Sequence, residues 1–217
     1  FTKRALIGAA VSLFAAKVPV WLVFALAGMV WLITLGLFAK LFRRTFGFDD
    51  KQLPLFVFMA GSPFFLKNFM HTLGHFVIYG CLLAICLLLI PARSVAYVLL
   101  AAAFSIVLVM IHHIHVLMYV PTIAAIVVLQ HYLPQGFTWG NVAAGIVALV
   151  VSGVLFIATQ FYGTADVPPQ VFIDHLQSRM ADPSRTDLLS FAFIWYQPLS
   201  KEIAEFTSGK AEGFARE

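Results

Sequence analysis

Carboxylates are missing from the middle of this chain, because no Asp or Glu lies between Asp50 and Asp166. The ionisable side chains in that stretch that carry or can accept a positive charge are Lys51, Lys67, Arg93, His71, His75, His112, His113, His115 and His131. A membrane core with cations and imidazoles but no acids is poorly suited to holding a metal cation or relaying protons through carboxylates. This pattern favours an anionic partner such as a phosphate-bearing lipid. The alternative is that the basic residues act only as topology signals and interfacial anchors.

Charge of either sign is scarce as well. Only 11% of the 217 residues are charged and 61% are hydrophobic, whereas roughly a quarter of a soluble domain is charged. Apolar runs of about 18 or more residues recur, which is typical of transmembrane helices. The runs are continuous and do not alternate with polar residues, which excludes an outer-membrane barrel.

The expected fold class is therefore all-α, a polytopic integral membrane protein with about five transmembrane helices, a re-entrant segment and an amphipathic C-terminal tail. Residues 1–163 would form the transmembrane helical domain and residues 164–217 the amphipathic or interfacial tail. The chain begins at Phe1 and enters apolar sequence almost at once, which indicates a fragment or a processed chain. Cysteine is rare: Cys81 and Cys86 point in different directions on a helix, so they are interpreted as small buried apolar residues.

Apolar runs and helix breakers together predict the segments. The predicted spans are Pro19–Ala39, His71–Ile90, Val95–Ile111, His115–Leu133 and Asn141–Tyr162. Leu53–Leu66 is short and is interrupted by Pro54, Gly61 and Pro63, which favours a re-entrant or interfacial piece. Apolar residues recur at helical spacing from Val171 to Met180, which predicts an amphipathic helix.

A cluster of basic residues sets the expected orientation. Lys40, Arg43, Arg44 and Lys51 follow the first span, so the positive-inside rule places this predicted loop in the cytoplasm. If Leu53–Leu66 is re-entrant, Arg93 lies outside and the histidines near residue 112 face the cytoplasm. If Leu53–Leu66 crosses fully, the histidines lie outside.

Three imidazoles stand close together in the longest apolar run, Ser94–Leu133, which has no acid, Lys or Arg, and ionisable groups at membrane depth often mark function. One interpretation joins two short spans by a tight turn at the histidines. The rival interpretation has one long helix to about Tyr119, with a broken half-helix after Pro121. Adjacent residues of a helix diverge by about 100°, so His112 and His115 could share a face while His113 could not join them.

Two chemistries fit these residues. A neutral imidazole could act as an acid or base on a phosphate-linked substrate, with Lys67 and Arg93 holding a diphosphate without metal. The candidate catalytic residues are His112, His113 and His115, and the candidate substrate-binding residues are Lys67, Asn68, His71, His75 and Arg93. No metal or cofactor is expected in this interpretation. The alternative is haem or metal held by His71, His75, His112 and His115, and the histidines could also be structural.

A weak family resemblance supports the first chemistry. The order Ser62-Pro63-Phe64-Phe65-Leu66-Lys67-Asn68, then His112-His113-x-His115 leading to Val120-Pro121, resembles the later half of bacterial polytopic polysaccharide polymerases and ligases of the O-antigen type. The resemblance implies an inner-membrane transferase that acts on a polyprenyl-diphosphate-linked saccharide, with His112 or His113 as the base and Lys67 and Arg93 on phosphate. The competing hypothesis is a non-catalytic accessory subunit with other membrane subunits as partners. Membrane lipids are expected partners, and nucleic acid is not.

Overall fold

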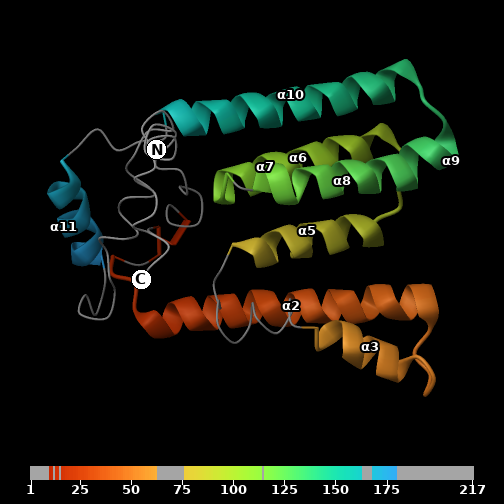
Figure 1. The fold of residues 1–217 in the computed structure, drawn as a ribbon, viewed down its shortest axis with the longest axis horizontal. Coiled ribbons are helices and arrows are strands. Elements are labelled where there is room, and N and C mark those ends of the chain that lie inside the picture. The colour runs from red at the N-terminus through yellow and green to blue at the C-terminus, as the bar shows by residue number, and fades with distance from the viewer. Residues whose placement is uncertain are drawn as a thin grey trace, which may run out of the picture. The chain divides into compact units, whose positions relative to one another are not determined.

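The long apolar runs of the sequence form helices in the computed structural model, which describes residues 10–11, 13–14, 16–62, 76–113, 115–162 and 168–179. The chain divides into two compact units, one of residues 20–153 and one of residues 1–19 together with 154–217. Every element in the described part of the chain is helical: α2 (Val20–Phe46), α3 (Leu53–Ala60), α5 (Val77–Leu89), α6 (Val95–Ile111), α7 (His115–Met118), α8 (Val120–Val127), the π-helix η1 (Val128–Tyr132), α9 (Leu133–Gln135), α10 (Trp139–Tyr162) and α11 (Pro169–Arg179) (Figure 1).

Several of these helices have the length and hydropathy of membrane-spanning helices. Three are long and apolar enough to cross one, over Trp21–Phe46, His115–Gln135 and Val142–Thr159. The helices Val77–Leu89 and Val95–Ile111 are apolar but shorter. At a rise of about 1.5 Å per residue, a helix of 17 residues is about 26 Å long, slightly less than a hydrocarbon core of about 30 Å. The prediction of an all-helical chain with membrane-spanning helices is confirmed at this level.

The first span is longer than predicted. Helix α2 continues past Ala39 to Phe46, so Lys40, Arg43 and Arg44 belong to its last turns and not to a loop. Basic side chains near a helix C-terminus interact favourably with the helix dipole. Aromatic packing also favours the extension, because the ring of Phe56 in α3 lies 5.6 Å from that of Phe38 and 5.4 Å from that of Phe42, centroid to centroid.

Helix α3 has eight residues, too few to cross a membrane, and Pro54 stands in its first turn. The predicted segment Leu53–Leu66 reaches into residues 63–75, which lie outside the described part of the chain.

The core of the 20–153 unit lies where α5, α6 and α8 meet. Leu87 and Leu108 are fully buried there, and the core also holds the ring of Tyr119. Gly80 of α5 allows this packing, because a Cβ at Gly80 would lie only 2.2 Å from Cδ2 of Tyr119. Small residues at helix interfaces allow such close approach in membrane proteins.

Helices α2 and α5 lie side by side and run in the same direction (Figure 1). Their C-terminal ends meet, since Nη1 of Arg44 donates a hydrogen bond of 3.2 Å to the carbonyl oxygen of Leu89. The chain has therefore passed from one end of the unit to the other between Phe46 and Val77. Arg93 therefore lies at the same end of the unit as Arg44, and not opposite the basic cluster as the re-entrant interpretation expected.

The turn predicted at the histidines is confirmed. Helix α6 ends at Ile111, and His112 caps it with an extended backbone at φ −158° and ψ 121°. That conformation is open to any residue, so the turn needs no glycine. The rival interpretation of one continuous helix to Tyr119 is wrong. Pro121 lies in the first turn of α8, where its missing N–H is not needed.

Helices α10 and α11 follow the predicted pattern. The last predicted span, Asn141–Tyr162, lies within α10, and α11 is a helix where one was expected, near Val171. Within its own unit, α11 is tied to the chain before α2, because Val18 donates a backbone hydrogen bond of 2.9 Å to Arg179.

Candidate functional site

Two arginines that are far apart in sequence line one open pocket, here called the basic mouth. Arg44 comes from the end of α2, and Arg93 comes from the connection between α5 and α6. The pocket has a volume of about 610 Å³, and its lining is Arg44, Leu88, Ile90, Pro91, Ala92, Arg93, Gln130, Pro134 and Gln135.

The connection that carries Arg93 is held by hydrogen bonds to its backbone. The carbonyl oxygen of Ala92 pairs with Nδ1 of His131 at 2.9 Å and also accepts a hydrogen bond from the side-chain amide of Gln135. The Nδ1–H tautomer of His131 is the form that donates to this carbonyl. These contacts tie the loop to η1 and α9 and fix the backbone next to Arg93.

Gln130 has a similar support. The hydroxyl of Tyr97 donates to Oε1 of Gln130 at 3.1 Å, and the buried ring of Tyr97 stacks on that of His131 at 6.1 Å between centroids. Gln130 and Gln135 are five residues apart, which on an α-helix would place them about 140° from each other. The π-helix η1 widens the turn between them, and both side chains line the basic mouth.

The basic mouth has two positive charges and no negative one. No lining residue is an acid. Within the described residues, neither Arg44 nor Arg93 forms an ion pair with a carboxylate. A guanidinium presents several N–H donors in a planar fork that matches phosphate oxygens, and an amide side chain adds a further donor. The arrangement can therefore bind a phosphate group without a metal.

The three clustered histidines come together at the other end of α6. His112 is 6% exposed and His115 is fully buried, and their ring centroids are 6.1 Å apart. The ring of His113 lies 4.8 Å from that of His112. The expectation that His113 cannot join the pair assumed an unbroken helix. It does not hold, because α6 ends at Ile111 and the turn redirects His113.

Aromatic rings surround this histidine cluster, which comprises His112, His113 and His115. Phe76 lies edge-on to His112 at 5.6 Å between centroids, and Tyr119 lies edge-on to His115 at 5.4 Å. In the described part of the chain, no three His, Cys, Asp or Glu side chains are arranged to hold a metal ion. The chemistry available to the cluster itself is hydrogen bonding and proton transfer by imidazole.

The structure separates candidate residues that the sequence grouped. Arg93 precedes α6 and the histidine cluster follows it, so a helix of 17 residues, about 26 Å long, lies between them. Arg93 and an imidazole of the cluster therefore cannot contact the same phosphate. The other candidates, Lys67, Asn68, His71 and His75, lie outside the described residues, and so does half of the alternative haem ligand set.

Sequence reasoning missed three contributors to the basic mouth. Arg44 was interpreted only as a topology signal, and Gln130 and Gln135 were not singled out. The available signal was that two amide side chains stand at the end of an otherwise apolar span, close to Pro134. His131 was counted among the basic groups, but its part in holding the Arg93 loop depends on a contact between distant segments.

Comparison with protein-family models, curated proteins and solved structures finds no match for this chain. The fold and the two sites define a class, that of an all-helical protein with several helices fit to cross a membrane.

Proposed function

We propose that this chain is a membrane protein that binds a phosphate-bearing lipid at the basic mouth. The observation that carries the proposal is the meeting of Arg44 and Arg93, from separate segments, in one pocket with no acid in its lining. Juxtamembrane basic residues attract anionic lipid headgroups, and two guanidinium groups can share one phosphate or diphosphate. A polyprenyl-phosphate-linked saccharide is the lipid that the family resemblance implies.

The basic residues also indicate how the 20–153 unit is oriented in the membrane. The end of the unit with the basic mouth also has Lys40, Arg43 and Lys51, so the positive-inside rule puts it at the cytoplasmic face. The histidine cluster then faces outward. In this arrangement α2, α5, α6, the segment α7 to α9, and α10 each run from one face towards the other.

The test measures lipid binding to the full chain in detergent by native mass spectrometry, with phosphatidylglycerol and phosphatidylcholine as probes. At about 1.5 kcal/mol for each charge-assisted hydrogen bond to the phosphate, the double variant R44Q/R93Q should bind phosphatidylglycerol about 150-fold more weakly. The matched control is Arg43→Gln, which removes one positive charge from the same turn of α2 without touching the mouth. It should weaken binding less than twofold.

Two results would contradict the proposal. One is equal binding of phosphatidylglycerol and phosphatidylcholine by the unaltered chain, since a phosphate site with two positive charges should prefer a net anionic lipid. The other is an equal loss of binding in R43Q and in Arg44→Gln alone, which would mean that the lipid responds to general surface charge and not to the mouth.

A second candidate function, glycan transfer on the lipid-linked saccharide, is favoured by the meeting of three imidazole rings at the outward end. In such a step an imidazole accepts the proton of an acceptor hydroxyl. The hydroxyl oxygen bonds to the anomeric carbon of the donor sugar, and the bond from that carbon to the diphosphate breaks.

This candidate is tested by chromatography of lipid-linked products after incubation with a polyprenyl-diphosphate-linked oligosaccharide. His112→Ala and His113→Ala should abolish lengthening of the glycan. The control, His175→Ala, changes an exposed histidine of α11 and should retain activity. A chain that lengthens no glycan, or variants that all remain active, would exclude this function.

A further inference from the structure

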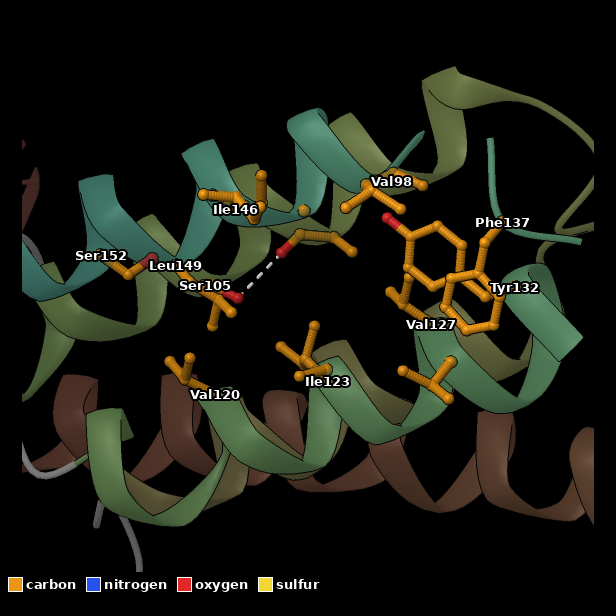
Figure 2. Close-up of a pocket in the computed structure, with 17 residues that line it drawn as sticks. Val98, Ser105, Val120, Ile123, Val127, Tyr132, Phe137, Ile146, Leu149 and Ser152 are labelled. Atoms are coloured by element: carbon orange, nitrogen blue, oxygen red, sulfur yellow. Dashed lines mark hydrogen bonds between the residues drawn. The ribbon is translucent and has the colours of Figure 1, made fainter. Parts of the chain in front are cut away.

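A second hollow, here called the apolar cavity, lies between α6, α8 with η1, and the first part of α10, all within the 20–153 unit (Figure 2). Its volume is about 250 Å³. Of its seventeen lining residues, only Ser105, Tyr132 and Ser152 have polar side-chain atoms. It shares no lining residue with the basic mouth, so what it binds is a separate question from the proposed function.

Small side chains and one aromatic ring create this space. Ala102 of α6 and Ala124 of α8 line the walls where a larger residue would fill the gap. On α10, Gly145 lets the Tyr132 hydroxyl approach to 2.8 Å of the point where a Cβ would stand. Tyr132 also stacks on Phe137 with ring centroids 5.2 Å apart, and the two rings lie together at one end of the cavity (Figure 2).

The lining decides what the cavity can hold. A buried water needs two to four polar partners, and apolar cavities of about 150 Å³ stay dry and bind small apolar molecules. The helices around this cavity are apolar and include two that are long enough to cross a membrane. In a bilayer the surrounding medium supplies hydrocarbon chains, which match an apolar lining.

Ser152 indicates that the ligand also has a polar atom. It is 1% exposed, and its Oγ has no hydrogen-bond partner among the described residues. Serine and threonine inside membrane helices usually bond to a carbonyl one turn earlier, as Ser105 does to Ala101 at 3.0 Å. A buried hydroxyl without a partner is destabilising, so Ser152 lacks an acceptor that a bound molecule can supply.

We propose that the apolar cavity binds the hydrocarbon chain of a single-chain lipid whose oxygen accepts a hydrogen bond from Ser152. A fatty acid has this chemistry. The hydrocarbon chain would lie along the alanine-lined walls, between the ring pair of Tyr132 and Phe137 at one end of the cavity and Ser152 at the other (Figure 2).

The test uses hexadecanoic acid with a photoactivatable diazirine in its chain, added to the full protein purified in detergent. Crosslinked peptides are mapped by mass spectrometry. They should come from α6, α8 and α10 at residues that line the cavity. Crosslinks spread evenly over the exposed faces of the helices would overturn the proposal.

Matched variants make the test specific. Ala102→Leu with Ala124→Leu fills the cavity, whereas Ala103→Leu with Ala125→Leu adds the same volume at adjacent, exposed positions outside it. The filled variant should lose crosslinking at least tenfold, and the control should stay within twofold of the unaltered chain. Equal crosslinking in the two variants would contradict the proposal.

Ser152→Ala tests the polar contact and should leave folding intact, because it removes only a hydroxyl. Loss of one hydrogen bond should weaken binding of the acid about fivefold. A control probe without an oxygen, the diazirine-labelled hydrocarbon of the same length, should bind S152A and the unaltered chain equally. If S152A binds the acid as tightly as the unaltered chain does, the assignment of Ser152 is wrong.

Discussion

Replacing Gly80 by alanine should disrupt the contact between α5 and the ring of Tyr119. The added Cβ would lie 2.2 to 2.5 Å from three carbons of the Tyr119 ring. Carbon atoms in contact are normally about 3.5 to 4.0 Å apart, so the ring would have to move by more than about 1 Å. Tyr119 is 9% exposed and packs in the core, which leaves it little room. Overpacking of this kind costs about 1 to 3 kcal/mol of unfolding free energy.

The assay for Gly80→Ala is unfolding of the purified protein in mixed micelles with increasing sodium dodecyl sulfate. Gly36→Ala is the matched control, because Gly36 is also in an apolar helix but a Cβ there would have no atom within 4 Å apart from its own stretch of helix backbone. Alanine in place of helical glycine should stabilise the protein there by about 0.5 to 1 kcal/mol. In a Tyr119→Ala background the Gly80 change should cost little. Equal effects of the Gly80 and Gly36 changes would refute the packing argument.

Three further predictions concern the two ends of the 20–153 unit. The first uses single cysteines in a chain without its native cysteines. Asp50→Cys and Ser94→Cys should react with an impermeant maleimide from one side of the membrane, and His113→Cys should react from the other. Labelling of all three from one side would contradict the proposed orientation. Raising sodium chloride from about 0.05 to 0.5 M should weaken phosphatidylglycerol binding, because salt screens exposed charges. The unaltered chain should lose affinity by a larger factor than R44Q/R93Q does. An equal loss in both would show that the arginines do not carry the interaction. His131→Phe removes the hydrogen bond to Ala92 but keeps an aromatic ring beside Tyr97, so it should lower the unfolding free energy by about 1 kcal/mol. A change below about 0.3 kcal/mol would show that this hydrogen bond adds little to stability.

Local patterns predicted the helices well. The break at the histidines follows from an uncharged apolar run too long for one span, and the start of α6 follows from Pro91 and Arg93 just before it. The end of the first span was less predictable. The basic residues after Ala39 favoured a loop at that point. The phenylalanine rings of α2 and α3 pack together there, however, and the chain stays helical to Phe46. That packing joins residues of two separate segments, which apolar periodicity does not report.

The direction in which α5 runs could not be predicted from local sequence patterns either. Hydropathy counts apolar segments, but it does not say which end of one segment meets which end of the next. The hydrogen bond from Arg44 to Leu89 supplies that information, and it moves Arg93 to the side of the basic cluster. Of the histidine cluster, the pairing of His112 with His115 was predicted from their spacing, but the place of His113 beside them was not, because it depends on the end of α6 at Ile111. The basic mouth was not predicted, because it combines α2, the α5–α6 connection and a π-turn.

The two ends of the unit require two separate tests, because one phosphate cannot reach both. The basic mouth and the histidine cluster are separated by the length of α6, about 26 Å, so the phosphate of a lipid held by Arg44 and Arg93 is out of reach of His112. If the chain transfers glycans at its outward end, R44Q/R93Q should strongly weaken anionic lipid binding at the mouth and leave glycan transfer intact, and H112A should abolish transfer and leave lipid binding intact. If R44Q/R93Q and H112A each abolish transfer, a single lipid must connect the two ends, and the separation argued from α6 would be wrong.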